Sequence, residues 1–96
     1  MNYMVCEWEH DNPQHPVLIY SELDEERYET RKIEIFRDGR IGYATTELMD
    51  NGATGLSEGP IPSVEEINAN PVLHAREISK EEFEQVWAEK VEKNQE

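Results

Sequence analysis

The chain of 96 residues carries 22 acidic and 9 basic side chains, so its formal net charge at pH 7 is −13. This charge argues against nucleic acid and anionic membrane surfaces as partners, and it favours a cationic partner. The length predicts a single domain over residues 1–96, and no apolar run approaches the ~20 residues of a membrane-spanning helix. We therefore expect a cytoplasmic protein without membrane association.

The first half of the chain predicts β-strands, which we place within residues 3–46. Apolar and polar side chains alternate imperfectly over residues 3–10, which is typical of a strand with two different faces. The Asp-Asn-Pro run at 11–13 predicts a turn. A short apolar strand is expected over 16–22, and a third strand over about 27–37.

A tight hairpin follows, because Asp38-Gly39 lies between two β-prone runs. A two-residue loop places the small side chains of Gly42 and Ala44 beside Ile33 and Ile35. We assign this aliphatic face to the core. The opposite face then carries Phe36, Ile41 and Tyr43.

The second half of the chain predicts a loop and two helices. Residues 47–60 contain three glycines and form a long loop, which is either functional or simply mobile. Ser63 and Ser79 each have a Glu three residues later, the signature of a capping box. They predict a short helix over about 63–69 and a C-terminal helix over 80–93, while 72–78 are ambiguous and fit an extended return strand.

The apolar stripe of the C-terminal helix determines the expected packing. Phe83, Val86, Trp87 and Val91 recur at helical spacing, so they form one face that can lie over the aliphatic side of the hairpin. The predicted fold is α+β, with a four- or five-stranded, mainly antiparallel sheet and the C-terminal helix packed on one face.

That packing leaves a second sheet face, which is either covered internally or exposed as an interaction surface. The candidate residues for an interaction surface are Tyr28, Phe36, Ile41 and Tyr43.

Three runs of the sequence are familiar: PVLIYSELD at 16–24, RKIEIFRDG at 31–39 and EISKEEF at 77–83. They resemble a family of small, mostly bacterial proteins known as an uncharacterised domain of unknown function. The resemblance extends over nearly the whole chain. It implies a compact stand-alone domain, and it brings no catalytic residue, cofactor or substrate with it.

Metal ligands are sparse in this chain. His10, Asp11 and His15, with the distant His74, form the one possible transition-metal set, but their spacing is irregular for a zinc site. The oxygen-bearing residues of the 47–60 loop lack the ligand pattern of an EF-hand. Gly52–Gly55 lacks the Lys-Ser/Thr of a phosphate-binding loop. We expect no metal and no cofactor.

Catalytic chemistry has equally little support. No serine lies in a Gly-x-Ser-x-Gly turn. Cys6 and His10 share a strand but lie ~13 Å apart along it, so they do not form a nucleophile–base pair. Cys6 is the single cysteine, which excludes an internal disulfide and fits a reducing compartment; we expect it to be a small buried apolar side chain.

Two functions remain open, beside the background possibility of a solvated accessory domain whose charge only prevents aggregation. The first is a non-catalytic protein-interaction module for a basic protein partner, with an inhibitor or immunity-type protein as its specific form. The second is a small-ligand-binding or catalytic domain in which residues 47–60 act as a lid over the sheet. It predicts a concave pocket beside Tyr43 and the 47–60 loop, with at least one carboxylate of perturbed pKa. The interaction module predicts a flat or convex exposed patch instead.

Overall fold

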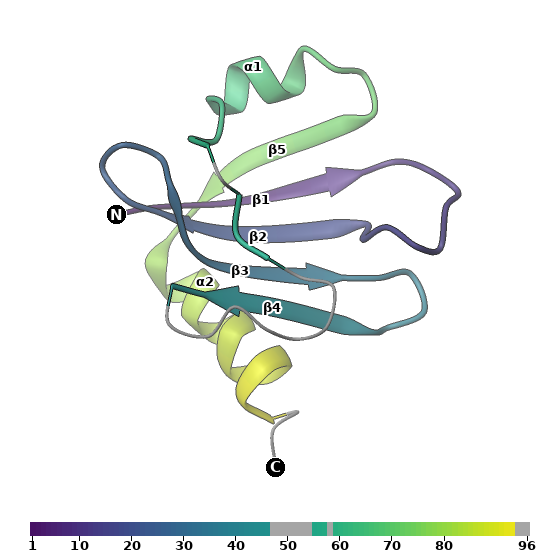
Figure 1. Ribbon diagram of the computed structural model, residues 1–96. Helices are drawn as coiled ribbons and strands as arrows, with labels where there is room; N and C mark the ends of the chain where they lie inside the picture. The colour runs from purple at the N-terminus through teal and green to yellow at the C-terminus, as the bar shows by residue number, and fades with distance from the viewer. Residues whose placement is uncertain (47–54, 58, 94–96) are drawn as a thin grey trace.

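The computed structural model describes residues 1–46, 55–57 and 59–93, which contain a five-stranded sheet (Figure 1). The strands are β1 (Asn2–Trp8), β2 (Leu18–Leu23), β3 (Glu29–Ile35), β4 (Ile41–Thr45) and β5 (Leu73–Ile78). Their order is β4-β3-β2-β1-β5, and every neighbouring pair is antiparallel. The predicted α+β class is confirmed, and the ambiguous residues 72–78 contain an edge strand.

Both Ser-x-x-Glu runs begin helices, and the first of them forms a complete capping box. The Ser63 side chain accepts a hydrogen bond from the backbone N–H of Glu66, and the Glu66 side chain closes the box before α1 (Val64–Asn68). The Ser79 hydroxyl oxygen accepts from the N–H of Glu82 at 3.0 Å before α2 (Lys80–Val86). Helix α2 continues as a wider π-helical segment, η1 (Trp87–Glu92).

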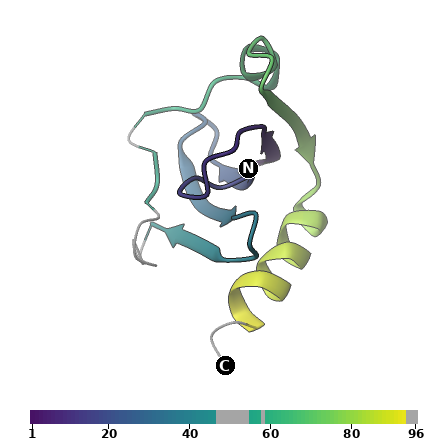
Figure 2. The same cartoon turned by 90° about the vertical axis from the view of Figure 1, so that its right-hand side faces the viewer.

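The sheet is covered on both faces (Figures 1 and 2). The α2 face, under α2 and η1, has a core of Tyr3, Ile33, Phe83 and Val91. The α1 face, under α1 and Ile61, has a core of Met4, Cys6, Leu23 and Ala75. Because both faces are covered, β1 buries four consecutive residues, 3–6, instead of every second one.

The register of the β3–β4 hairpin differs by one residue from the prediction. Ile35 lies opposite Ile41, and Ile33 lies opposite Tyr43. The N–H of Phe36 donates to the carbonyl of Arg40 at 2.9 Å, so the loop has three residues, 37–39, and ends on Gly39 with a φ of 92°. This positive φ suits glycine in a bulged hairpin loop.

The one-residue difference exchanges the faces of β4. Ile41 and Tyr43 join Ile33 and Ile35 on the α2 face. The C-terminal helix therefore covers Ile33 and Ile35 as predicted, but it also packs against Tyr43, whose ring centroid is 6.0 Å from that of Trp87. The expected separation of an aliphatic core face from an aromatic open face is wrong.

Arg31 joins the C-terminal helix to the sheet. Its guanidinium donates two hydrogen bonds to Glu22, at 3.0 and 2.7 Å, and two to Glu84, at 3.1 and 2.7 Å. It also lies 4.9 Å from the ring centroids of both Phe83 and Trp87. Burial raises the pKa of Glu22, but the hydrogen bonds from Arg31 and Thr30 outweigh it and hold that pKa below its ordinary value. Arg31 thus fixes the position of α2 over β2 and β3.

Arg27 holds the cover of the α1 face in place. The loop from Asp24 to Tyr28 has the same backbone hydrogen bonds as the β3–β4 loop, with Arg27 in the position that usually requires glycine, at a φ of 68°. Its guanidinium donates to the carbonyl oxygens of Ile61 and Pro62 at 2.8 and 2.7 Å. The left-handed backbone costs about 1 kcal/mol for a residue other than glycine. The two hydrogen bonds compensate for it.

Asn68 of α1 closes part of the outer edge of β5. Its side-chain amide donates to the carbonyl of Ala75 at 2.9 Å and accepts from the N–H of Ala75 at 2.6 Å. The amide thereby replaces a neighbouring strand at this position. Open sheet edges promote pairing between molecules, so this contact limits the surface available for aggregation.

Candidate functional site

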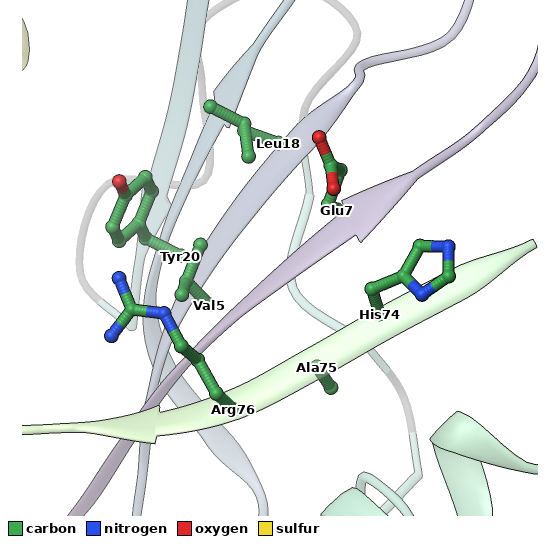
Figure 3. Close-up of a pocket in the computed structure, with 7 residues that line it drawn as sticks. All are labelled: Val5, Glu7, Leu18, Tyr20, His74, Ala75 and Arg76. Carbon is green, nitrogen blue, oxygen red and sulfur yellow. The ribbon is translucent and has the colours of Figure 1, made fainter.

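A groove of about 340 Å³ lies on the α2 face over β1, β2 and β5, and we call it the β1 groove (Figure 3). Two cross-strand rows form it. The first row is Leu18–Glu7–His74, and the second is Tyr20–Val5–Arg76. Ala75 also lines the groove, although its side chain points to the other face of the sheet.

A second hollow of about 380 Å³ adjoins the β1 groove, because Glu7 lines both. It lies between the end of β1 and the β1–β2 loop. Its other lining residues are Trp8, Glu9, His10, Asp11, Val17 and Arg37. Together the two hollows are lined by the acidic residues Glu7, Glu9 and Asp11 and by the apolar side chains of Val5, Val17 and Leu18, among others.

The charges of this surface are only partly paired. Arg76 donates to Glu82 at 3.0 Å, and His74 contacts the Glu9 carboxylate. Among the described residues, the carboxylates of Glu7 and Asp11 have no hydrogen-bond or ion-pair partner. An incoming cation therefore meets two carboxylates that no ion pair within the described chain engages. The Arg37 guanidinium lines the same hollow and donates to the carbonyl of His10.

The floor of the groove is half-buried and contains one ionisable hydroxyl. Burial, and secondly the charge of Glu82, raise the pKa of Tyr20 above its ordinary value. Tyr20 is therefore a neutral hydrogen-bonding group at physiological pH.

His10 has a structural position in the β1–β2 loop. Its Nδ1 accepts from the N–H of Asn12 at 3.0 Å, which places the proton on Nε2 and directs it to the carbonyl of Pro16 at 2.8 Å. The ring also packs edge-on against Trp8, at 4.4 Å between centroids. Both ring nitrogens are thus occupied. Within the described part of the chain, no group of three or more His, Cys, Asp or Glu residues is arranged to hold a metal ion.

The four residues predicted as an interaction surface are dispersed. Ile41 and Tyr43 are half-buried beside Trp87 on the α2 face. Phe36 follows β3, where the Arg40 guanidinium lies 4.7 Å above its ring. Tyr28 precedes β3 and is 42% exposed, roughly 25 Å away from Phe36 along the strand. The structure therefore brings only Ile41 and Tyr43 together.

Sequence reasoning missed the β1 groove. Glu7 and His74 are neighbours only because β5 pairs with β1, and the sequence left residues 72–78 ambiguous. The alternation of residues 3–10 was the available signal, since it places Val5 and Glu7 on one face.

The fold and the groove define a small α+β domain whose antiparallel sheet is covered by a helix on each face. The profile of a family described as "Domain of unknown function (DUF6881)" matches residues 2–92, so the chain belongs to this family. Searches of curated proteins and of solved structures found no match. Within the described residues, no helix has the length and apolar character that crossing a membrane requires.

Proposed function

We propose that this protein is a non-catalytic, cytoplasmic protein-interaction module that binds a basic partner through the β1 groove. The observation that carries the proposal is the Glu7 carboxylate, which has no ion-pair or hydrogen-bond partner among the described residues and lies between Leu18 and His74 in an open groove. The proposed surface is thus a groove and not the flat or convex patch expected for an interaction module. A role as an inhibitor or immunity-type protein of a basic protein is its specific form.

The groove suits the side chains of a basic segment. The aliphatic stem of a lysine or arginine can lie over Val5 and Leu18 while its charged head reaches Glu7. Arg76 does not oppose this contact strongly, because Glu82 already pairs with it. The net charge of −13 attracts a cationic partner at longer range and accelerates encounter at low salt.

Affinity capture with matched charge variants tests the proposal. Tagged wild type, a Glu7→Gln/Glu9→Gln/Asp11→Asn variant and a Glu26→Gln/Glu65→Gln/Glu92→Gln control are incubated with lysate of the source cells at low and high salt. Both variants lose the same charge from exposed positions. We expect a stoichiometric basic protein with the wild type and control at low salt, and its loss from the groove variant.

Association rates measured with this protein and the purified partner provide a second test. Removing rim charges slows association, so the groove variant should associate roughly tenfold more slowly than the control at low salt. Equal rates for the two variants would show that the partner, if any, binds elsewhere. A captured protein that is acidic, or that stays bound equally at high salt, would also contradict the proposal.

The alternative function, a small-ligand-binding or catalytic domain with a lid, relies on residues 47–60. Residues 47–54 and 58 lie outside the described residues. The pocket expected beside Tyr43 involves these residues and stays a prediction. Among the described residues, a cavity lies on the opposite face of the sheet, under Ile61 and Pro62. This cavity favours the ligand-binding form of the alternative.

A further inference from the structure

An apolar cavity of about 330 Å³ lies within the α1 face, between the sheet and the segment that leads into α1. Arg27 fixes this segment through the carbonyls of Ile61 and Pro62. The apolar lining comes from the sheet, the segment and α1: Met4, Cys6, Ile19, Ile61, Pro62, Ile67 and Leu73. The cavity is separate from the β1 groove, which lies on the other face.

Polar groups line the cavity on the β2–β3 side. The Glu29 side chain is 3% exposed; its carboxylate accepts from the Ser21 hydroxyl at 3.1 Å and from the N–H of Ser57 at 2.6 Å. Both carboxylate oxygens of Glu29 are therefore occupied, and Glu29 has a structural role here: it ties residue 57 to the sheet.

Lys32 differs from Glu29 because its N–H groups make no hydrogen bond within the described part of the chain. The ammonium nitrogen lies 3.7 Å from Glu29 and 3.8 Å from Glu34, and its side chain is 15% exposed. Both distances exceed the 2.7–3.2 Å that is usual for an N–H···O hydrogen bond. The ammonium is thus held by charge alone, with N–H groups available to an acceptor inside the cavity.

The surroundings of Lys32 select the kind of acceptor. Two carboxylates lie beside one ammonium, so the local charge is negative and opposes a ligand carboxylate or phosphate. A cationic head cannot accept a hydrogen bond from Lys32, and the Lys32 ammonium repels it. An uncharged oxygen accepts a hydrogen bond from Lys32 without either penalty.

The volume sets the size of the ligand. An apolar cavity of about 150 Å³ accommodates benzene, so this cavity has room for a bicyclic molecule or a chain of about a dozen non-hydrogen atoms. We propose that the cavity is a binding site for a small, mostly apolar molecule with one uncharged hydrogen-bond acceptor, such as a ketone, ester or alcohol oxygen, directed at Lys32.

Three naphthalene derivatives that differ in head group test this site: 2-acetonaphthone, 2-naphthoate and 2-naphthylmethylamine, which are neutral, anionic and cationic. Cys6 lines the cavity and is the single cysteine of the chain, so its rate of labelling by a thiol reagent reports occupancy. We expect 2-acetonaphthone to slow labelling with a Kd on the order of 100 µM. Its NMR shift changes should centre on Met4, Ile19 and Ile67.

Variants separate the head-group contact from the cavity itself. Lys32→Met retains most of the stem and should weaken binding of 2-acetonaphthone about tenfold, the effect of losing one charged hydrogen bond. Ile19→Phe should fill the cavity and abolish binding even if Lys32→Met fails to fold. Glu92→Gln, at an exposed position of η1 on the other face, should leave binding unchanged.

Several results would overturn the proposal. One is undiminished labelling of Cys6 at the solubility limit of 2-acetonaphthone. Another is protection by 2-naphthoate or the amine as strong as by the ketone. NMR shift changes centred on the β1 groove would also overturn it. So would a folded Lys32→Met variant that binds 2-acetonaphthone with wild-type affinity. The proposed binding of a basic partner is unaffected by any of these outcomes, because it depends on the opposite face.

Discussion

Replacement of Arg31 by methionine should destabilise the protein strongly, because Arg31 neutralises a carboxylate that the fold buries. Glu22 is 7% exposed, and its other side-chain partners are neutral hydroxyls of Thr30 and Tyr3. Removing one member of a buried ion pair costs roughly 3–5 kcal/mol of folding free energy. The two hydroxyls still hydrogen-bond to Glu22, so we expect a loss of about 3 kcal/mol for Arg31→Met. Glu84 is 42% exposed and adds little.

The effect is large compared with the total stability. Domains of this size unfold with about 5–15 kcal/mol, and a loss of ~3 kcal/mol lowers the midpoint of thermal unfolding by roughly 15 °C. Urea denaturation of wild type and Arg31→Met at pH 7 measures the difference. A Glu22→Gln/Arg31→Met variant should be more stable than Arg31→Met, because a neutral amide is easier to bury than an unpaired carboxylate.

The pH dependence of the stability lost in Arg31→Met tests whether the unpaired Glu22 carboxylate causes that loss. In the wild type the pKa of Glu22 is lowered from 4.5, so its contribution to stability is present above the unfolded pKa and is lost as the pH falls through the folded pKa. Without Arg31, burial raises the pKa of Glu22, and protonation then relieves the penalty as the pH falls. The gap between wild type and Arg31→Met should therefore narrow from pH 7 to pH 5. A constant gap, or a loss below 1 kcal/mol at pH 7, would refute this reasoning.

Two further substitutions test the supports of the α1 face. Asn68→Ala removes both hydrogen bonds to Ala75, so the free energy of unfolding measured by urea denaturation should fall by about 1–2 kcal/mol. Light scattering should show concentration-dependent association, because the edge of β5 is then open. Unchanged stability would show that water replaces the amide. Arg27→Ala keeps the unfavourable φ and removes the contacts to Ile61 and Pro62, at a cost of about 2 kcal/mol. Arg27→Gly should be more stable than Arg27→Ala by about 1 kcal/mol, because glycine accepts that backbone freely, and the opposite order would contradict the role assigned to φ.

Local signals predicted the elements well. The Ser-x-x-Glu runs at Ser63 and Ser79 specify helix starts through contacts within four residues, and both helices begin there. The hairpin after β3 was also predicted correctly as a hairpin. Its loop length was not, because Asp38-Gly39 suits both a two-residue and a three-residue loop. Register depends on which loop forms, and one residue of difference moved Tyr43 to the other face.

Local sequence patterns could not predict the two candidate sites, the β1 groove and the apolar cavity. The β1 groove exists because β5 returns beside β1 and places His74 next to Glu7. The apolar cavity exists because Arg27 draws the carbonyls of Ile61 and Pro62 over the opposite face. Each contact joins segments that are distant in the chain, so it cannot be predicted from the secondary-structure propensities of neighbouring residues.

The amino-acid sequence alone determined three features of this protein. Composition determined its acidic character, and short-range periodicity determined its strand and helix segments and the apolar stripe of its C-terminal helix. Tertiary structure decided which side chains share a face and where hollows remain. The physical reason is that the side of a sheet on which a residue lies depends on strand register, and register is set by the packing of the whole domain.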